Sequence, residues 1–278
     1  MRILERRQVP GLATLYLADS GRPERVMEFV DTLEPGVPRS EKWVMMISTQ
    51  IGCPVGCLLC DAGTLGYRGN LTAEEMLEQV RQIAGDNPGL NPRSHPKVKI
   101  HFARMGEPAL NPEVLKALIH LGRHSGWPGL VPSVSTVAPK SPAVEPFFEQ
   151  LIAVKRDFFG GGRFQLQFSV HSTDEAQRRR LVPVRTWTLE EIAAYGERFV
   201  RPGDRKITLN FAAPPGAPLD AAVVERVFRP DRFLVKITPV NPTETSDRRG
   251  TSRLWNEAPE DVSRFAAGLE SAGFRVIL

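Results

Sequence analysis

CPVGCLLC, residues 53–60, is the stretch that decides the fold of this chain, because it holds Cys53, Cys57 and Cys60, the only cysteines among 278 residues. An odd number of cysteines in one short cluster argues against a disulfide framework. A structural zinc site takes four ligands, and the nearest histidine, His95, lies far along the chain. A four-iron cluster accepts three thiolates and leaves one iron open for a chelating cofactor. The spacing therefore favours an iron–sulfur cluster, with zinc binding and a redox thiol cluster as the alternatives.

The composition is that of a globular protein without a strong charge bias. Hydrophobic residues make up 41% and charged residues 24%, and the formal net charge is +4. That balance tolerates an anionic partner without requiring one, and no apolar stretch approaches the roughly 18 residues that cross a bilayer. Three arginines before the short apolar stretch 11–18 vaguely resemble a signal peptide. Because Pro10 and Asp19 bracket that stretch, we expect a leading strand or hairpin instead.

Strands and helices alternate along the chain. Hydrophobic runs predict strands at residues 43–48, 98–102, 130–137, 164–170, 206–211 and 233–240, with a short last strand at 274–278. Thr72 opens a capping box at the start of a helix, and Thr188 caps a helix that runs to about residue 200. Asn111 and Pro112 are the expected N-cap and first residue of another helix. A closing helix is expected at residues 259–272.

This alternation predicts an α/β fold with a parallel sheet, in which helices cross over between neighbouring strands. Six such units indicate a partial (β/α)6 barrel rather than a full eight-unit barrel. We expect a short N-terminal strand or hairpin extension at residues 1–40 and a barrel domain at residues 41–278, without a linker between them. Ligands gather at the C-terminal ends of the strands in such folds, and the motifs described next all fall at those ends.

The chain resembles one branch of the radical S-adenosylmethionine (SAM) superfamily, the ribosomal-RNA adenine C2/C8 methyltransferases. The spacing of the cysteines is the superfamily's signature, and the resemblance runs from about Val26 to the end of the chain. Further blocks carry it, at residues 48–53 (STQIGC), 60–66 (CDAGTLG), 70–72 (NLT), 105–108 (MGEP) with Asn111, 135–136 (ST), 169–171 (SVH) and 239–242 (PVNP). Several blocks in the right order are far more specific than the cysteines alone.

The resemblance implies a radical SAM barrel with a [4Fe-4S] cluster ligated by Cys53, Cys57 and Cys60, and SAM bound at the strand ends. The SAM contacts that it implies are Gly106, Glu107, Ser135, Ser169, Val170, His171 and Asn241. Glu107 would pair with the ammonium of SAM through a charge-assisted hydrogen bond, and Gly106 would let the backbone approach the ligand. Taken alone, Glu107 could also be a surface residue before a helix, and the serines could be plain loop residues.

The chain departs from that family in its cysteines. The related methyltransferases use two more, one just before the cluster loop and one near the C-terminus that carries the methyl group. Met46 stands at the first position, and these 278 residues contain no further cysteine. Because a thioether cannot ionise to a thiolate, we expect no methyl-cysteine intermediate. The family's N-terminal RNA-binding extension has no counterpart before Cys53, and Leu59 replaces the aromatic residue usual before the third cysteine.

Two further features carry weaker expectations. Glu28 lies in a segment that resembles the one holding the family's proton-accepting glutamate, which implies a catalytic role, although an exposed strand glutamate is the simpler interpretation. Arg178, Arg179 and Arg180 could contact an anionic substrate. A charge run is usually a solvated helix face, and we favour that interpretation here.

We therefore expect an enzyme, similar to a methyltransferase, that cleaves SAM reductively at the cluster to form a 5′-deoxyadenosyl radical. The cofactors carry that chemistry, while the protein supplies orientation and excludes water. The alternatives are a non-methylating rearrangement, oxidation or adenosylation of a small molecule or peptide, and a non-catalytic RNA-binding or cluster-sensing relative. The expected partners are an external electron donor of the flavodoxin or ferredoxin type and a small-molecule, peptide or RNA substrate, without a membrane. We expect a cytoplasmic monomer.

Overall fold

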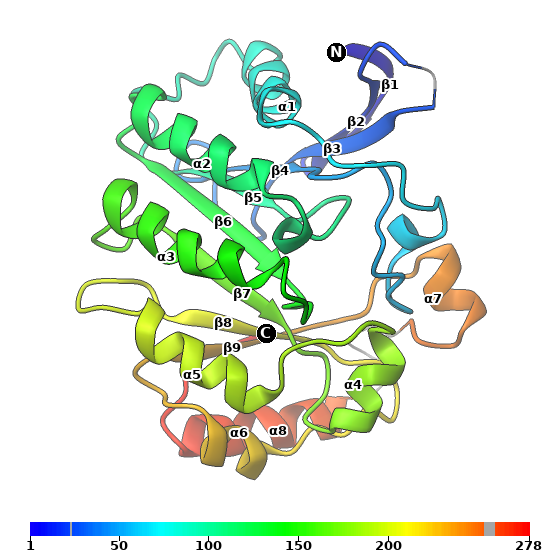
Figure 1. Ribbon diagram of the computed structural model, residues 1–278, viewed down its shortest axis with the longest axis vertical. Helices are drawn as coiled ribbons and strands as arrows, with labels where there is room; N and C mark the ends of the chain where they lie inside the picture. The colour runs from blue at the N-terminus through cyan, green and yellow to red at the C-terminus, as the bar shows by residue number, and fades with distance from the viewer. Residues whose placement is uncertain (23, 253–258) are drawn as a thin grey trace.

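The computed structural model describes residues 1–22, 24–252 and 259–278, and its strands form one sheet in chain order (Figure 1). The strands are β1 Arg2–Val9, β2 Ala13–Asp19, β3 Val26–Thr32, β4 Trp43–Ile47, β5 Val98–Phe102, β6 Leu130–Thr136, β7 Gln165–Ser169, β8 Ile207–Ala212, β9 Phe233–Thr238 and β10 Val276–Ile277. Strands β1 to β4 pair antiparallel, and each later strand pairs parallel with the one before it. The arrangement confirms the predicted α/β partial barrel.

The helices are α1 Ala73–Gly85, α2 Glu113–His124, α3 Glu145–Phe158, α4 Glu175–Leu181, α5 Leu189–Phe199, α6 Ala221–Val227, α7 Glu244–Arg248 and α8 Pro259–Ser271, with the 3-10 helices η1 Asp61–Gly63 and η2 Pro108–Leu110. Most of them cover one face of the sheet, whereas α7 lies beside η1, away from that face (Figure 1). In Figure 1, α2, α3 and α5 lie in a row across the strands. Right-handed crossovers place the helices of consecutive parallel units on the same face, which leaves the opposite face of the sheet without them.

The predicted element boundaries agree with the structure to within two residues. The capping boxes at Thr72 and Thr188 are both present, and each threonine hydroxyl accepts a hydrogen bond from the backbone N–H three residues on. The predicted start of α2 differs from the structure by one residue, since the helix begins at Glu113 with Pro112 as its N-cap. The side chain of Asn111 nevertheless accepts the Glu113 N–H at 3.1 Å, which is the hydrogen bond expected of a capping residue.

Alternate residues of the parallel strands divide the sheet into an apolar face and a polar face. Phe168 of β7 lies 6.2 Å from Phe148 of α3, and Phe211 of β8 lies 5.2 Å from Phe265 of α8 (ring centroids), so these side chains face the helices. The residues between them point to the opposite face, which we call the inner face. Its polar members are Lys99, His101, Ser133, Ser135, Gln165, Gln167, Ser169, Thr208, Asn210, Lys236 and Thr238. A sheet that encloses a polar ligand carries such a face.

The N-terminal strands extend the barrel sheet as an antiparallel meander. The stretch 11–18 forms most of β2, in agreement with the expected strand or hairpin. Tyr16 of β2 stacks on Phe29 of β3 with ring centroids 4.8 Å apart, and Trp43 Nε1 donates to Asp31 at 2.9 Å. Residues 1–40 thus continue the sheet, and their separation as an extension stays a prediction. Among the residues described, no helix combines the length and apolarity needed to cross a membrane.

Candidate functional site

The loop that holds the cysteines follows β4 and is closed at its base by backbone hydrogen bonds. Ile51 N donates to the carbonyl of Gly69 at 3.0 Å, and Arg68 N donates to the carbonyl of Ile51 at 2.9 Å. Gly52 has φ +69°, and a Cβ there would lie 1.7 Å from the carbonyl oxygen of Gly66. Only glycine fits this close approach, so the loop leaves the C-terminal end of β4 as a compact closed turn.

Two of the three cysteines, Cys53 and Cys57, lie against an apolar patch, whereas Cys60 is exposed. The residues of the patch are Val55, Val137, Leu181 and Val182. Burial raises the pKa of all three thiols, that of Cys53 to about 11, and the neighbouring thiols contribute to the rise at Cys53 and Cys57. A bound metal ion would remove these protons outright. Three thiols without a fourth cysteine in the chain form the donor set that suits an iron–sulfur cluster with one open iron.

The cysteine side chains are not arranged as a closed metal site in the described part of the chain, where no group of three His, Cys, Asp or Glu residues is placed to hold a metal ion. The mutual electrostatic influence of the thiols nevertheless places them near one another. Their role as cluster ligands therefore stays a prediction, and it rests on the chemistry of the donors and on the loop that carries them.

Glu107 lies in the turn after β5 and is buried, so the interpretation of it as a surface residue is wrong. Its Oε1 accepts hydrogen bonds from the backbone N–H of Ala109 at 2.9 Å and from the hydroxyl of Thr136. Its Oε2 accepts the backbone N–H of Val137 at 2.9 Å. The carboxylate thus joins the turn after β5 to the end of β6.

The carboxylate of Glu107 keeps room for one more hydrogen bond. A carboxylate offers about four lone-pair positions, and the three donors named above leave one free on Oε2. Burial raises the pKa of Glu107 to about 7, while the hydrogen bonds from Thr136, Val137 and Ala109 lower it. A cation beside Oε2 would favour the ionised form. An ammonium group therefore fits this position chemically.

Several motif residues make contacts within the protein. Gln50 accepts the backbone N–H of Glu107 at 2.8 Å and donates to Asn70 at 2.8 Å. Asn111 donates to one backbone carbonyl at each end of the cysteine loop, at 2.6 and 2.9 Å. Gly106 has φ +96°, and a Cβ there would lie 2.6 Å from the side chain of Gln50. These contacts fasten the cysteine loop to the turn that carries Glu107.

Ser135 and Ser169 lie on the inner face at the C-terminal ends of β6 and β7. Ser135 Oγ is 2.6 Å from Nε2 of His101, a residue that the sequence analysis did not single out. Burial lowers the pKa of His101 well below its usual value, and the charge of Lys99 adds to this effect. The imidazole is therefore neutral at pH 7, and it links Ser135 to the rest of the inner face.

His171 follows β7 in a left-handed backbone conformation, with φ 68°, which is uncommon for a residue other than glycine. Its Nδ1 accepts the backbone N–H of Ala212 at 3.2 Å. Burial lowers the pKa of His171 to about 4, and the charge of Arg178 lowers it further. The backbone N–H of Val170 donates to the carbonyl of Asn210 at 2.8 Å. The turn after β7 is thus held rigidly, with a neutral imidazole.

Asp61, directly after Cys60, holds the C-terminal segment against the cysteine loop. Its carboxylate accepts the backbone N–H groups of Glu244 at 3.3 Å and Thr245 at 2.8 Å, at the start of α7. Asn241 lies just before α7, is exposed, and accepts the hydroxyl of Ser246 on its carbonyl at 2.7 Å. The structure therefore brings the segment of Asn241 beside the cysteines. Asp61 belongs to the motif at residues 60–66, but the sequence did not reveal this role, because its partners lie more than 180 positions away.

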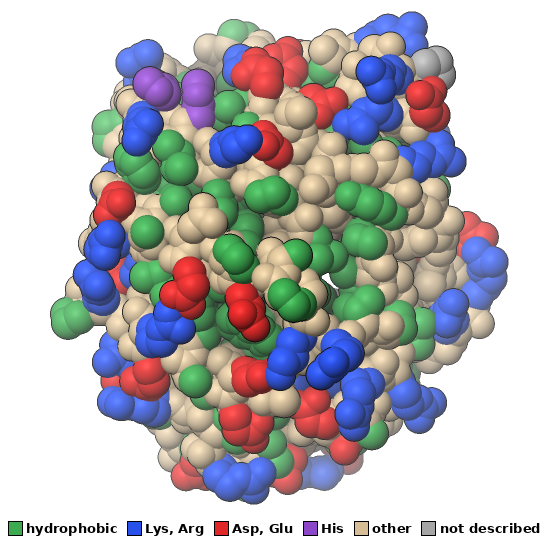
Figure 2. Space-filling model, viewed as in Figure 1, with side chains coloured by type: hydrophobic (Ala, Val, Ile, Leu, Met, Phe, Trp, Pro, Cys, Tyr) green, Lys and Arg blue, Asp and Glu red, His purple; other side chains and the backbone are tan. Residues whose placement is uncertain are grey.

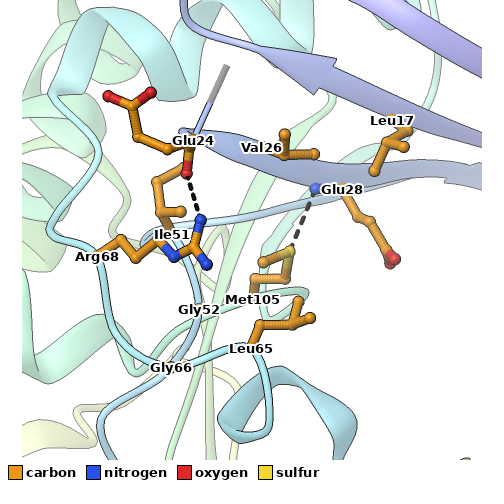
Figure 3. A pocket seen from close by; sticks show the side chains of 10 residues that line it. All are labelled: Leu17, Glu24, Val26, Glu28, Ile51, Gly52, Leu65, Gly66, Arg68 and Met105. Carbon is orange, nitrogen blue, oxygen red and sulfur yellow. Dashed lines mark hydrogen bonds between the residues drawn. The ribbon is translucent and has the colours of Figure 1, made fainter. Parts of the chain in front are cut away.

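Glu28 of β3 lines a pocket of about 270 Å³ beside the cysteine loop (Figure 3). The lining residues are Leu17, Glu24, Val26, Glu28, Ile51, Gly52, Leu65, Gly66, Arg68 and Met105. Figure 3 shows the side chain of Glu28 pointing from β3 toward the side on which Met105 and Leu65 lie. Its carboxylate accepts hydrogen bonds from Arg104 Nε at 3.0 Å and Nη2 at 2.6 Å. The charge of Arg104 lowers the pKa of Cys60 and that of Glu28 raises it. The catalytic role of Glu28 stays a prediction.

The arginine run on α4 is only partly a solvated face, so that expectation is wrong for Arg178. Its side chain is buried, pairs with Glu175 at 2.5 Å, and donates to the carbonyl of Trp187 at 3.0 Å. Arg179 and Arg180 are exposed. Figure 2 shows Lys and Arg side chains gathered over α4. Arg178 thus serves the packing of α4, and its two neighbours face the solvent.

Comparison with known proteins gives relatives of one kind. No protein-family model matches the chain. It is 33% identical over 248 residues to a "Probable dual-specificity RNA methyltransferase RlmN" of Desulfitobacterium hafniense, an alignment covering 85% of this chain and 63% of that protein. It is 28% identical over 247 residues to the "Ribosomal RNA large subunit methyltransferase N" of Nitrosopumilus maritimus, covering 86% of this chain and 66% of that protein. The chain thus spans just under two thirds of these curated relatives.

A solved structure has the same fold over the whole chain. The crystal structure of a radical SAM methyltransferase from Sphaerobacter thermophilus superimposes with a TM-score of 0.78 and 25% sequence identity. The match covers 99% of this chain and 75% of that one. The relatives and this structure agree with the resemblance found in the sequence motifs.

Proposed function

We propose that this chain, a homologue of the radical SAM methyltransferases, is an enzyme that binds SAM beside a [4Fe-4S] cluster held by Cys53, Cys57 and Cys60. When bound, the cluster supplies the electron that cleaves SAM into methionine and a 5′-deoxyadenosyl radical. One observation carries the proposal. The loop with the three thiols lies at the C-terminal ends of the strands, within electrostatic range of Glu107. The three thiols and the buried carboxylate of Glu107 thus share one edge of the sheet, as the proposal requires.

The chain's own residues would bind and orient SAM at that edge. Oε2 of Glu107 offers its free lone pair to the ammonium, and Gly106 lets the backbone approach the ligand. The hydroxyls of Ser135 and Ser169, on the inner face, can bond the carboxylate or the ribose of SAM. Further contacts follow from the resemblance, at Val170, His171 and Asn241. The apolar patch beside the thiols excludes water from the site.

The reaction we propose is methyl transfer without a methyl-cysteine intermediate. The relatives are named RNA methyltransferases, which supports RNA as the substrate. Met46 stands where the related family has its cysteine before the cluster loop, and it lies on the inner face next to His101 in the strand register. A thioether at this place cannot act as a thiolate. Any methyl group would therefore pass from a SAM-derived species to the substrate directly.

A non-methylating modification of a small molecule or peptide is the second candidate. The presence of Met46 on the inner face favours it, because the scaffold then lacks a thiol where the methylation chemistry of the family uses one. In both cases we propose a cytoplasmic monomer that receives its electron from an external donor of the flavodoxin or ferredoxin type.

Anaerobic reconstitution with iron and sulfide tests the cluster. We expect about four irons and four sulfides per chain, visible absorbance, and 5′-deoxyadenosine when SAM and dithionite are added. Cys57→Ala should lose iron, absorbance and product, whereas Leu59→Ala, in the same loop, should keep the iron. Zinc in place of iron in the reconstituted protein, or a cluster that never cleaves SAM, would contradict the proposal.

SAM with a labelled methyl group tests the route of methyl transfer. We expect no covalent label on the 278-residue chain, and 5′-deoxyadenosine without an obligatory release of S-adenosylhomocysteine. Mass spectrometry of the protein after turnover decides the question. A methyl adduct on one of the three cysteines that forms in step with product would overturn the proposed route, as would S-adenosylhomocysteine released before any substrate is added.

A further inference from the structure

Four lysines share the inner face, three of them at or just before the N-terminal ends of β4 and β5 and one in the middle of β9. We call Lys42, Lys97, Lys99 and Lys236 the inner-face lysines. Lys99 of β5 lies between Val44 and Val131 in the strand register, and Lys42 and Lys97 precede β4 and β5 with the same alternation. Lys236 of β9 pairs with Asn210, two residues before the end of its strand. Lys42, Lys97 and Lys99 thus lie at the end of the sheet opposite the cysteine loop, and Lys236 joins them from the middle of β9.

These lysines have few acidic partners among the residues that the structure describes. Lys97, Lys99 and Lys236 form no ion pair there, and Lys42 pairs with Glu34, which is partly exposed. Another buried lysine, Lys155 of α3, shows the usual arrangement. It pairs with Asp204 and donates to the carbonyl of Phe199 at 2.6 Å. A buried charge without a partner is costly, so a bound anion would stabilise the inner-face lysines.

The inner-face lysines also act on one another. Burial lowers the pKa of Lys99 to about 8, and the charges of Lys236 and then Lys97 lower it further. Burial lowers the pKa of Lys42 to about 7, with Lys97 and Lys99 contributing. These effects agree with the strand register, which places Lys42, Lys97 and Lys99 at neighbouring positions of β4 and β5 on one face of the sheet. An anion placed there would be attracted by all four charges at once.

A buried hydroxyl lies in the same region. Ser133 of β6 is 1% exposed, and its Oγ has no hydrogen-bond partner. In the register it lies beside His101, on the inner face and two residues beyond the level of Lys99. His101 in turn contacts Ser135, the serine expected to contact SAM. A polar path therefore runs along the inner face from the lysines through Ser133 and His101 to the proposed SAM site.

We propose that the inner face binds a small phosphorylated molecule, whose phosphate lies among the inner-face lysines and whose other end reaches toward Ser135. Along β6, the position level with Lys99 and the position of Ser135 are four residues apart, which is about 13 Å at the rise per residue of a strand. A nucleotide-sized molecule spans that length. The lysines are half-buried or buried rather than displayed on an exposed surface, which suits a small ligand better than a folded RNA.

The binding of phosphate stands independently, whereas the role of this molecule as the substrate rests on the proposed function. Ser133 would donate its hydroxyl to a phosphate oxygen or to a neighbouring oxygen of the ligand. The lysines would hold the phosphate as charged donors. The reactive part of the ligand would then face the strand ends, where the proposed function places SAM.

Titration of the full reconstituted chain with inorganic pyrophosphate, followed by calorimetry, tests the site. We expect saturable binding by one pyrophosphate per chain. Lys99→Met and Lys236→Met should each weaken it at least tenfold, because each removes one charge-assisted contact. The matched control is Lys116→Met, a mostly exposed lysine of α2, which should bind as the unaltered chain does.

Stability without pyrophosphate separates a binding role from a structural one. If Lys99 serves to bind a ligand and not to stabilise the fold, Lys99→Met should have the same unfolding midpoint as the unaltered chain or a higher one. Methionine removes an unpaired buried charge without a loss of volume. Pyrophosphate that fails to saturate, equal binding by Lys99→Met and Lys116→Met, or a large loss of stability in Lys99→Met would each overturn the proposal. So would binding of a single-stranded RNA that depends on Lys99 and that pyrophosphate does not displace. Iron content measured on the same samples reports the proposed cluster separately.

Discussion

Replacement of Glu107 by glutamine tests the electrostatics at the centre of the site. Burial raises the pKa of Glu107 from 4.5 to about 7, so the folded protein keeps a proton that the unfolded chain releases. The contribution of this proton to the free energy of unfolding is complete below pH 4.5 and is lost as the pH rises through 7. That difference in pKa corresponds to about 3 kcal/mol. Glutamine does not titrate, so the free energy of unfolding of the unaltered chain, relative to Glu107→Gln, should fall by about that amount over this range.

Urea denaturation of both proteins at pH 5, 6, 7 and 8 provides the measurement. The difference in the free energy of unfolding should decrease steadily up to about pH 7 and then level off. Glu225→Gln, at an exposed position of α6, is the control for a charge removed from the surface. If the difference for Glu107→Gln is the same at every pH, the reasoning is refuted, because the three hydrogen bonds from Ala109, Thr136 and Val137 would then keep the carboxylate ionised throughout.

Three further predictions concern the same edge of the sheet. The affinity of the unaltered chain for SAM, measured by calorimetry, should fall as the pH drops below 7, because Glu107 then takes up a proton. At pH 8, Glu107→Gln should bind SAM ten- to a hundredfold more weakly than the unaltered chain. An affinity that does not depend on pH would remove Glu107 from the site. Gly106→Ala should lower the free energy of unfolding by about 2–4 kcal/mol, because φ +96° strains a residue other than glycine and the added Cβ would lie 2.6 Å from Gln50. The control Gly216→Ala, with φ +69° and open space around the added Cβ, should lower it by only about 1 kcal/mol. Equal losses in the two variants would contradict this. Glu28→Gln should change stability by less than about 1 kcal/mol, since its ion pair with Arg104 is partly exposed, so that a large loss of 5′-deoxyadenosine formation would point to catalysis and an unchanged rate would argue against it.

The cysteine loop, the strands of the barrel and the helices α1, α2, α5 and α8 could be predicted because their signals are local, whereas α3, the longest helix that the structure describes, was not predicted. The cysteines stand within eight residues of one another, and the capping boxes at Thr72 and Thr188 each span one turn of helix. Hydrophobic runs bounded by turns mark strands whatever lies beside them. The positions of Gly106, Glu107, Ser135 and Ser169 at strand ends followed from the same local reading.

The surroundings of these residues depend on contacts between distant parts of the chain. Glu107 is buried because it contacts the end of β6, about thirty residues away in the sequence. Arg178 is buried because α4 packs on the segment of Trp187. Asp61 finds the start of α7 more than 180 residues later. None of these distances leaves a periodic or compositional trace. The sequence therefore left a surface position for Glu107 open as an alternative, predicted a solvated face for Arg178, and did not reveal the partners of Asp61.

The sequence alone determined the kind of chemistry, because thiol spacing and strand-end motifs are properties of short segments. The tertiary structure alone decided which charges are paired. Alternation along β5 and β9 puts Lys99 and Lys236 on one face of their own strands, but only the assembled sheet brings them together, with no acidic partner among the residues that the structure describes. Charge balance depends on distance through space, which the order of residues does not contain, and that is why the inner-face lysines emerge only in the folded chain.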